Sequence, residues 1–136
     1  MRTEYRFNPP PYSLHDLPVR FVVDGDQLTL VTEYGVSDNS QFSANDSWRI
    51  EIRSVDWFDS CVDITTSKEA DGSFSGKRVN LSELLKRCPD LRFDVMTEQF
   101  GVNRIRLRGR ANIDGEYRKI TVEIYHAGNI GYVIGE

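Results

Sequence analysis

Residues 104–125 read RIRLRGRANIDGEYRKITVEIY, and this stretch decides the fold of the chain. Asp114-Gly115 accepts the positive φ angles of a two-residue β turn, which predicts a hairpin that turns there. The expected pairs are Gly109–Ile120, Leu107–Val122 and Ile105–Ile124 on one face, and Arg110–Lys119, Arg108–Thr121, Arg106–Glu123 and Arg104–Tyr125 on the other. A shift of one residue would place arginines opposite isoleucine and valine, so the hydrophobic pattern and the turn predict the same register.

The composition is that of an ordinary globular protein. The chain has 136 residues, of which 39% are hydrophobic and 28% charged, and this length suits one domain with a core of its own. We expect an extended proline-rich arm over residues 1–18 and a β-rich body over residues 19–136. No apolar run fits a signal peptide or a membrane helix, which favours a cytoplasmic protein without a membrane partner.

Alternating apolar residues predict further strands on both sides of the hairpin. Phe21 is expected opposite Leu28 or Leu30, because Asp24-Gly25-Asp26 allows two positions for the turn. The predicted strands are residues 19–23, 28–34, 48–52, 56–66, 74–79 and 91–96, with a last one in the tail at 128–135.

One helix is expected, near residues 80–88. Asn80 is a favourable N-cap with Glu83 three positions later, and Pro89 ends the run. Its apolar stripe at helical spacing is Leu81, Leu84, Leu85 and Cys88. The predicted fold is therefore α+β and predominantly antiparallel, a bent sheet or partly open barrel of about eight strands with one short helix.

Catalytic and metal-binding patterns are missing from the sequence. The two histidines, His15 and His126, lie at opposite ends of the chain, and no HxxxH, CxxC or Gly-x-Ser-x-Gly spacing occurs. Cys61 lies among aspartates that should raise its pKa and weaken it as a nucleophile. Cys61 and Cys88 are expected to be reduced and partly buried. We expect no cofactor and no metal.

A row of basic side chains is the first candidate binding site. It lies on the outward face of the hairpin, with residues about 7 Å apart along one strand, and comprises Arg104, Arg106, Arg108 and Arg110, with Tyr125 opposite the first of them. Arg110 opposite Lys119 is a like-charge pair, which weakens a hairpin unless an acid lies nearby. That acid is expected from Asp56 or Asp59 on a neighbouring strand, or from a partner. A solvated face without a binding role is the alternative.

The stretch Asp56-Trp57-Phe58-Asp59 is the second candidate contact, because aromatic anchors ringed by polar groups are typical of binding hot spots. Here the alternative is that one ring enters the core, the other covers a sheet edge, and the aspartates mark a bend in a strand.

These features favour a non-enzymatic protein-binding module that docks its arginine row on an acidic or mixed-charge protein. A net charge of −4 and the lack of interleaved aromatic rings argue against nucleic acid. The alternatives are a small-ligand pocket lined by Trp48 and Trp57, and an enzyme that uses His15 or His126 beside an aspartate. No motif matches a family specifically. In a general way the chain resembles small bacterial β-rich proteins, some of which are toxin-neutralising immunity proteins.

Overall fold

The computed structural model describes residues 2–5, 14, 17–32, 48–68 and 74–134. Its strands are β1 (Arg2–Tyr5), β2 (Leu17–Asp24), β3 (Gln27–Thr32), β4 (Trp48–Ile52), β5 (Cys61–Lys68), β6 (Phe74–Asn80), β7 (Arg92–Gly101), β8 (Arg104–Ile113), β9 (Glu116–Tyr125) and β10 (Ile130–Ile134), and its helix is α1 (Leu81–Arg87). The sequence also predicts a polar loop over residues 35–46 and a turn at Asp71-Gly72, and both lie outside the described residues.

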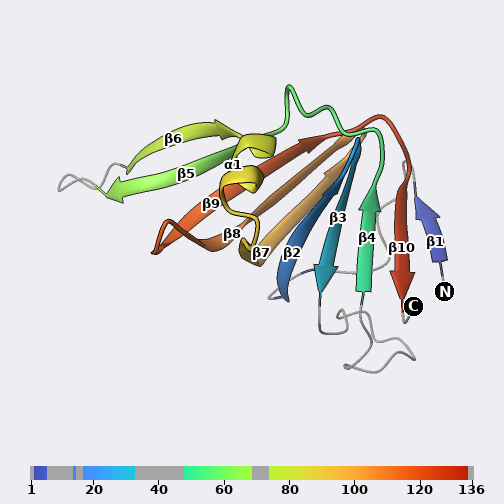
Figure 1. Cartoon of the computed structure of the whole chain (residues 1–136), viewed down its shortest axis with the longest axis horizontal. Helices are drawn as coiled ribbons and strands as arrows, with labels where there is room; N and C mark the ends of the chain where they lie inside the picture. The colour runs from blue at the N-terminus through green and yellow to red at the C-terminus, as the bar shows by residue number, and fades with distance from the viewer. Residues whose placement is uncertain (1, 6–13, 15–16, 33–47, 69–73, 135–136) are drawn as a thin grey trace.

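The strands form one antiparallel sheet in the order β1-β10-β4-β3-β2-β7-β8-β9-β5-β6. The sheet is bent and open, and α1 lies over its β5–β6 end (Figure 1). The predicted α+β class and the bent, mostly antiparallel sheet are confirmed. The described sheet has ten strands rather than about eight. The expectation did not include β1, which lies in the segment assigned to the arm and pairs with β10.

The β8–β9 hairpin has the predicted register, from Arg104 opposite Tyr125 to Arg110 opposite Lys119. Asp114 and Gly115 take φ angles of 53° and 86°, as a tight hairpin turn requires. The adjoining pairs continue the sheet on both sides, because β7 pairs with β8 and β5 pairs with β9. This hairpin is therefore central to the half of the sheet that carries the arginine row.

The structure decides between the two registers that the sequence allowed for the β2–β3 hairpin. In the β2–β3 hairpin Phe21 lies opposite Leu30, and Gly25 with φ of 60° lies in the turn.

The strand predicted over 56–66 begins only at Cys61. The residues before it form a turn, because one side-chain oxygen of Asp56, Oδ1, accepts hydrogen bonds from the backbone N–H groups of Phe58 and Asp59 at 3.1 and 3.2 Å.

The helix begins as predicted. Asn80 is its N-cap, and the Asn80 Oδ1 accepts a hydrogen bond from the Glu83 backbone N–H at 3.2 Å. Leu81, Leu84 and Leu85 are buried in the core that the inner faces of the strands share. The helix therefore covers the inner face of the sheet at its β5–β6 end.

Two features bend the sheet beside the arginine row. The β7–β8 register shifts between Val95 and Thr97, so Met96 is an extra residue in β7. Gly109 lies beneath this bulge, where an added Cβ would stand 1.9 Å from the Asp94 backbone oxygen. The lack of a side chain at Gly109 therefore lets β7 approach β8 closely.

Candidate protein-binding face

The outer face of β6, β5, β9 and β8 carries a cationic face, defined here by Arg104, Arg106, Arg108 and Arg110 of β8, Lys119 of β9 and Arg78 of β6. Cross-strand pairing aligns these side chains in rows, and one such row runs from Arg108 through Thr121 and Asp63 to Arg78. Arg104, Arg108 and Arg110 are exposed and Arg106 is half-buried. The predicted arginine row thus lies outside the core.

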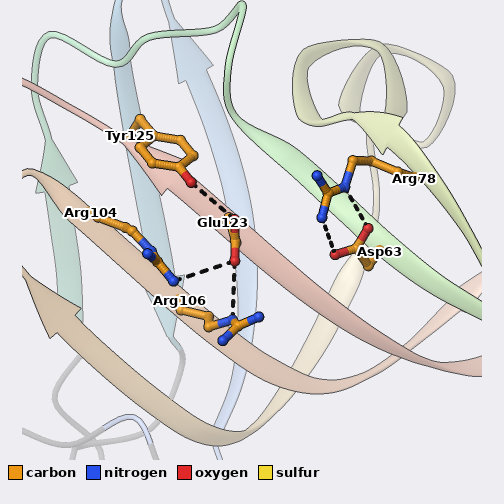
Figure 2. Close-up of polar contacts among 6 residues, drawn as sticks. All are labelled: Asp63, Arg78, Arg104, Arg106, Glu123 and Tyr125. Atoms are coloured by element: carbon orange, nitrogen blue, oxygen red, sulfur yellow. Dashed lines mark hydrogen bonds and ion pairs between the residues drawn. The ribbon is translucent and has the colours of Figure 1, made fainter.

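Glu123 organises one end of this face. Arg106 Nε lies 3.1 Å and Arg104 Nη2 lies 3.6 Å from Glu123 Oε1, while the Tyr125 hydroxyl donates a hydrogen bond to Glu123 Oε2 at 3.2 Å (Figure 2). This hydrogen bond raises the pKa of Tyr125, because the ionised phenol would repel the carboxylate. These contacts hold Arg106, whose side chain is 30% exposed, more closely than Arg104, whose side chain is 46% exposed.

Asp63 and Arg78 form a second ion pair, between β5 and β6. Arg78 donates through Nε to Asp63 Oδ1 at 2.8 Å and through Nη2 to Oδ2 at 3.0 Å, a two-point contact (Figure 2). The hydrogen bonds from Arg78 lower the pKa of Asp63. This pair was not predicted from the sequence, although Asp63 and Arg78 lie at outward positions of neighbouring predicted strands.

The remaining cations of the face are unpaired. Arg108, Arg110 and Lys119 form no ion pair within the part of the chain that the structure describes. The acid in register with Arg110 is Asp94 of β7, and Asp94 Oδ2 accepts a hydrogen bond from the Tyr117 hydroxyl at 2.6 Å. Positive charge is therefore concentrated around the like-charge pair that the sequence predicts.

Two of the hollows along the cationic face lie beside the arginine row. The first, of about 390 Å³, is here called the central hollow, and its side-chain lining includes Met96, Thr97, Arg108, Arg110, Lys119 and Thr121. The second, of about 530 Å³, lies at the β7–β8 turn and is lined by Gln99, Phe100, Gly101, Val102, Arg104 and Arg106. Of the exposed apolar residues, Met96 lines the first hollow and Val102 the second. The face thus combines charge with exposed apolar contact area.

The Trp57 segment lies at the Arg104 end of the face and is tied into the fold. The Asp56 backbone N–H donates to the Tyr125 carbonyl at 2.7 Å. The Trp57 ring is partly buried against the core, and its Nε1 donates to the Gly25 carbonyl at 2.9 Å. Phe58 is 90% exposed, so the expectation that the second ring covers a sheet edge is wrong.

Asp56 and Asp59 do not neutralise the arginine row in the described residues. Asp56 caps its own turn, and its charge raises the pKa of Asp59. The acids that stand beside the arginines are Glu123, Asp63 and Asp94. The sequence placed Glu123 opposite Arg106, and the register confirms that pair. Asp63 and Asp94 were not predicted as neighbours of the arginines, because strand order across the sheet, rather than proximity along the chain, brings them there.

The two tryptophans do not line a common pocket. Trp48 begins β4 and is fully buried, opposite Thr32. Trp57 follows the other end of β4 and contacts Gly25 in the β2–β3 turn. The whole length of β4 therefore separates the two rings.

The remaining residues that were considered for chemistry are the two histidines and the two cysteines. His126 is buried and its Nδ1 lies 2.9 Å from the Gly128 carbonyl oxygen, while His15 lies outside the described part of the chain. Cys61 and Cys88 are free and partly buried. Burial is the main cause that raises the pKa of Cys61; Arg78 lowers it, and Asp63, Glu123 and Asp59 raise it by smaller contributions.

Within the described ranges, no group of histidine, cysteine and acidic side chains is arranged to hold a metal ion. No helix in these ranges is long and apolar enough to cross a membrane. Comparison with protein-family models, curated proteins and solved structures finds no match to this chain.

Proposed function

We propose that this chain is a non-enzymatic protein-binding module and that its cationic face docks on an acidic surface of a protein partner. The observation that carries the proposal is a set of exposed cations that form no ion pair within the described residues, Arg108, Arg110 and Lys119, in a chain whose formal net charge is −4. Like-charge pairs on neighbouring strands destabilise a sheet. A face with no binding role would therefore carry this cost in stability without any benefit, whereas a face that binds an acidic partner would use the charges.

The exposed apolar and aromatic side chains near the cations favour a protein as the binding partner over a free ion. Tyr117, Met96 and Val102 are exposed by 57%, 45% and 66%. Aromatic and methionine side chains beside arginine are enriched at the centres of protein interfaces. The charged residues would steer an acidic partner toward the face and fix its orientation, while these apolar groups would supply contact area that excludes water.

The test compares charge reversals on opposite faces of the sheet. Arg104→Glu/Arg108→Glu reverses two exposed charges of the cationic face. Lys77→Glu/Lys86→Glu is the matched control: both lysines are exposed, Lys77 lies opposite inward-facing Ile64, and Lys86 lies on α1. Both double variants change the net charge by the same amount, so a general charge effect would act on both alike.

Each immobilised protein is incubated with lysate of its cell of origin, and bound polypeptides are identified by mass spectrometry. We expect an acidic polypeptide on the wild type and on the lysine control, and none on the arginine variant. Binding should weaken between about 0.1 M and about 1 M salt, as the Debye length falls from about 10 Å to about 3 Å. The same polypeptides on all three proteins would refute a role of the cationic face.

A further inference from the structure

We propose that the central hollow is an oxyanion subsite, which takes one carboxylate or phosphate group from a side chain of the protein partner. The inference rests on the proposed function and deepens it. The hollow has a volume of about 390 Å³ and opens on the outer face between the β7 bulge and β9. Its cations are Arg108, Arg110 and Lys119.

The charges in the hollow converge. Arg110 lies directly opposite Lys119, and Arg108 lies opposite Thr121, two residues farther along the same strands. Side chains in these positions are about 5 to 8 Å apart, within reach of one bound oxyanion. Asp63 is paired with Arg78, and Asp94, in register with Arg110, accepts a hydrogen bond from the Tyr117 hydroxyl. Neither acid forms an ion pair with the three cations of the hollow in the described residues, so an incoming oxyanion would reduce the repulsion between them.

Donors for an oxyanion line the same space. The guanidinium groups of Arg108 and Arg110 offer planar forks that match carboxylate and phosphate oxygens, and the lysine adds a point charge. Thr97 and Thr121 contribute hydroxyl groups, which donate to charged oxygens. Met96 supplies an apolar wall against which the stem of the partner's side chain can pack.

The backbone beneath the hollow is specialised. The bulge in β7 places Met96 beside Thr97 on the outer side, and Gly109 permits the close approach of β7. Bulges are common next to functional sites because they redirect side chains. Bulge, glycine and like-charge pair therefore coincide at one place in the sheet.

Lys119→Glu separates a binding role from a structural one. The new carboxylate would face Arg110 and neutralise the like-charge pair, so we expect the melting temperature to stay equal or to rise. The same change would fill the subsite with negative charge. If Lys119 had a structural role, the substitution would lower the melting temperature. Lys119→Gln serves as a second variant that removes the charge without reversing it.

Fluorescent hexaglutamate and a phosphoserine peptide of equal charge are the probes, with hexaglutamine as the neutral control. We expect saturable binding that shifts the amide resonances of Thr97, Lys119 and Thr121, with affinity reduced at least tenfold in Lys119→Glu. Tighter binding of one charged peptide identifies carboxylate or phosphate as the preferred oxyanion. No saturable binding of either peptide, or equal affinity in Lys119→Glu, would overturn the subsite.

Capture of the protein partner distinguishes the two proposals. If Arg104→Glu/Arg108→Glu loses the partner while Lys119→Glu retains it in full, the subsite is refuted and the cationic face stands. If all variants retain the partner, the face itself is refuted and the subsite with it.

Discussion

Arg106 and Glu123 meet on the outer face of the β8–β9 hairpin, with Arg106 Nε 3.1 Å from Glu123 Oε1, although only 10% of the Glu123 side chain is exposed. The carboxylate is held there by its neighbours, since Arg104 Nη2 lies 3.6 Å from the same oxygen and the Tyr125 hydroxyl donates to the other oxygen. A buried carboxylate that makes several contacts of this kind stabilises the hairpin only while its partners remain.

Glu123→Gln is therefore expected to lower the free energy of unfolding by about 1–3 kcal/mol, because it removes the charge that two arginines and the Tyr125 hydroxyl contact at a buried position. Double-mutant cycles with Arg106→Gln and Arg104→Gln, followed by urea unfolding, divide this loss between the two arginines. We expect a coupling near 1 kcal/mol for Arg106 and less than about 0.5 kcal/mol for Arg104, which is nearly half exposed. Equal couplings would contradict this assignment.

The pair of Asp63 and Arg78 predicts a pH effect. Arg78 holds the pKa of Asp63 below its ordinary value of 3.8. The pair thus adds stability that is present above pH 3.8 and is lost as the pH falls through the lowered pKa. The gain is small, because both side chains are more than a third exposed.

Arg78→Gln should return the pKa of Asp63 to near 3.8 and reduce the loss of stability in acid. The measurement is an NMR titration of the Asp63 carboxyl carbon, combined with urea unfolding over the acid range. Lys77→Gln on the same strand is the control and should leave the pKa of Asp63 unchanged. An unchanged pKa in Arg78→Gln would show that another group sets it.

The fold of the hairpin follows from short-range rules, which explains why its register was predictable. Asp114-Gly115 fixes the turn, and the alternation from Ile105 to Ile113 fixes which face is buried. The helix was predictable for the same reason, since Asn80 and the leucine stripe act within two turns. Such signals do not depend on the strand order of the sheet.

Strand order was not predictable, and most of the site chemistry depends on it. The C-terminal strand β10 lies between β1 and β4, and β5 lies between β9 and β6. Asp63 therefore lies on the same face as the arginine row, although it precedes Arg104 by about 40 residues in the sequence. Val62 and Ile64 predicted an extended segment over 56–66, and this pattern did not reveal the turn before Cys61, in which the Asp56 side chain accepts hydrogen bonds from local backbone N–H groups.

Gly109→Ala tests the close approach of β7 and β8. The added Cβ would lie 1.9 Å from the Asp94 backbone oxygen and 2.9 Å from the Phe93 ring, so the strands must separate. We expect a loss of at least about 2 kcal/mol in the free energy of unfolding, in the range found for overpacked sites. Gly101→Ala is the control, because its nearest contact is 3.7 Å and the change should stay within about 0.5 kcal/mol. Equal effects at both glycines would contradict a special role for Gly109.

Asn80 joins the helix to the Trp57 segment, and its two functions can be separated. Its Oδ1 accepts from the Glu83 backbone N–H, while its Nδ2 donates to the Trp57 carbonyl at 2.7 Å. Asn80→Ala loses both contacts and should cost about 1.5–3 kcal/mol, the sum of a cap and a hydrogen bond. Asn80→Ser keeps a capping oxygen and should cost about 1 kcal/mol.

Asn80→Asp discriminates further between the two contacts. A carboxylate favours the positive end of the helix dipole, yet here it would place a charged oxygen against the Trp57 carbonyl, which can only accept. We therefore expect Asn80→Asp to be less stable than Asn80→Ser in urea unfolding at neutral pH, and to recover part of that loss in acid as the carboxyl becomes a donor. If the aspartate variant is the more stable of the two at neutral pH, capping alone explains Asn80, and the contact with Trp57 contributes little to the fold.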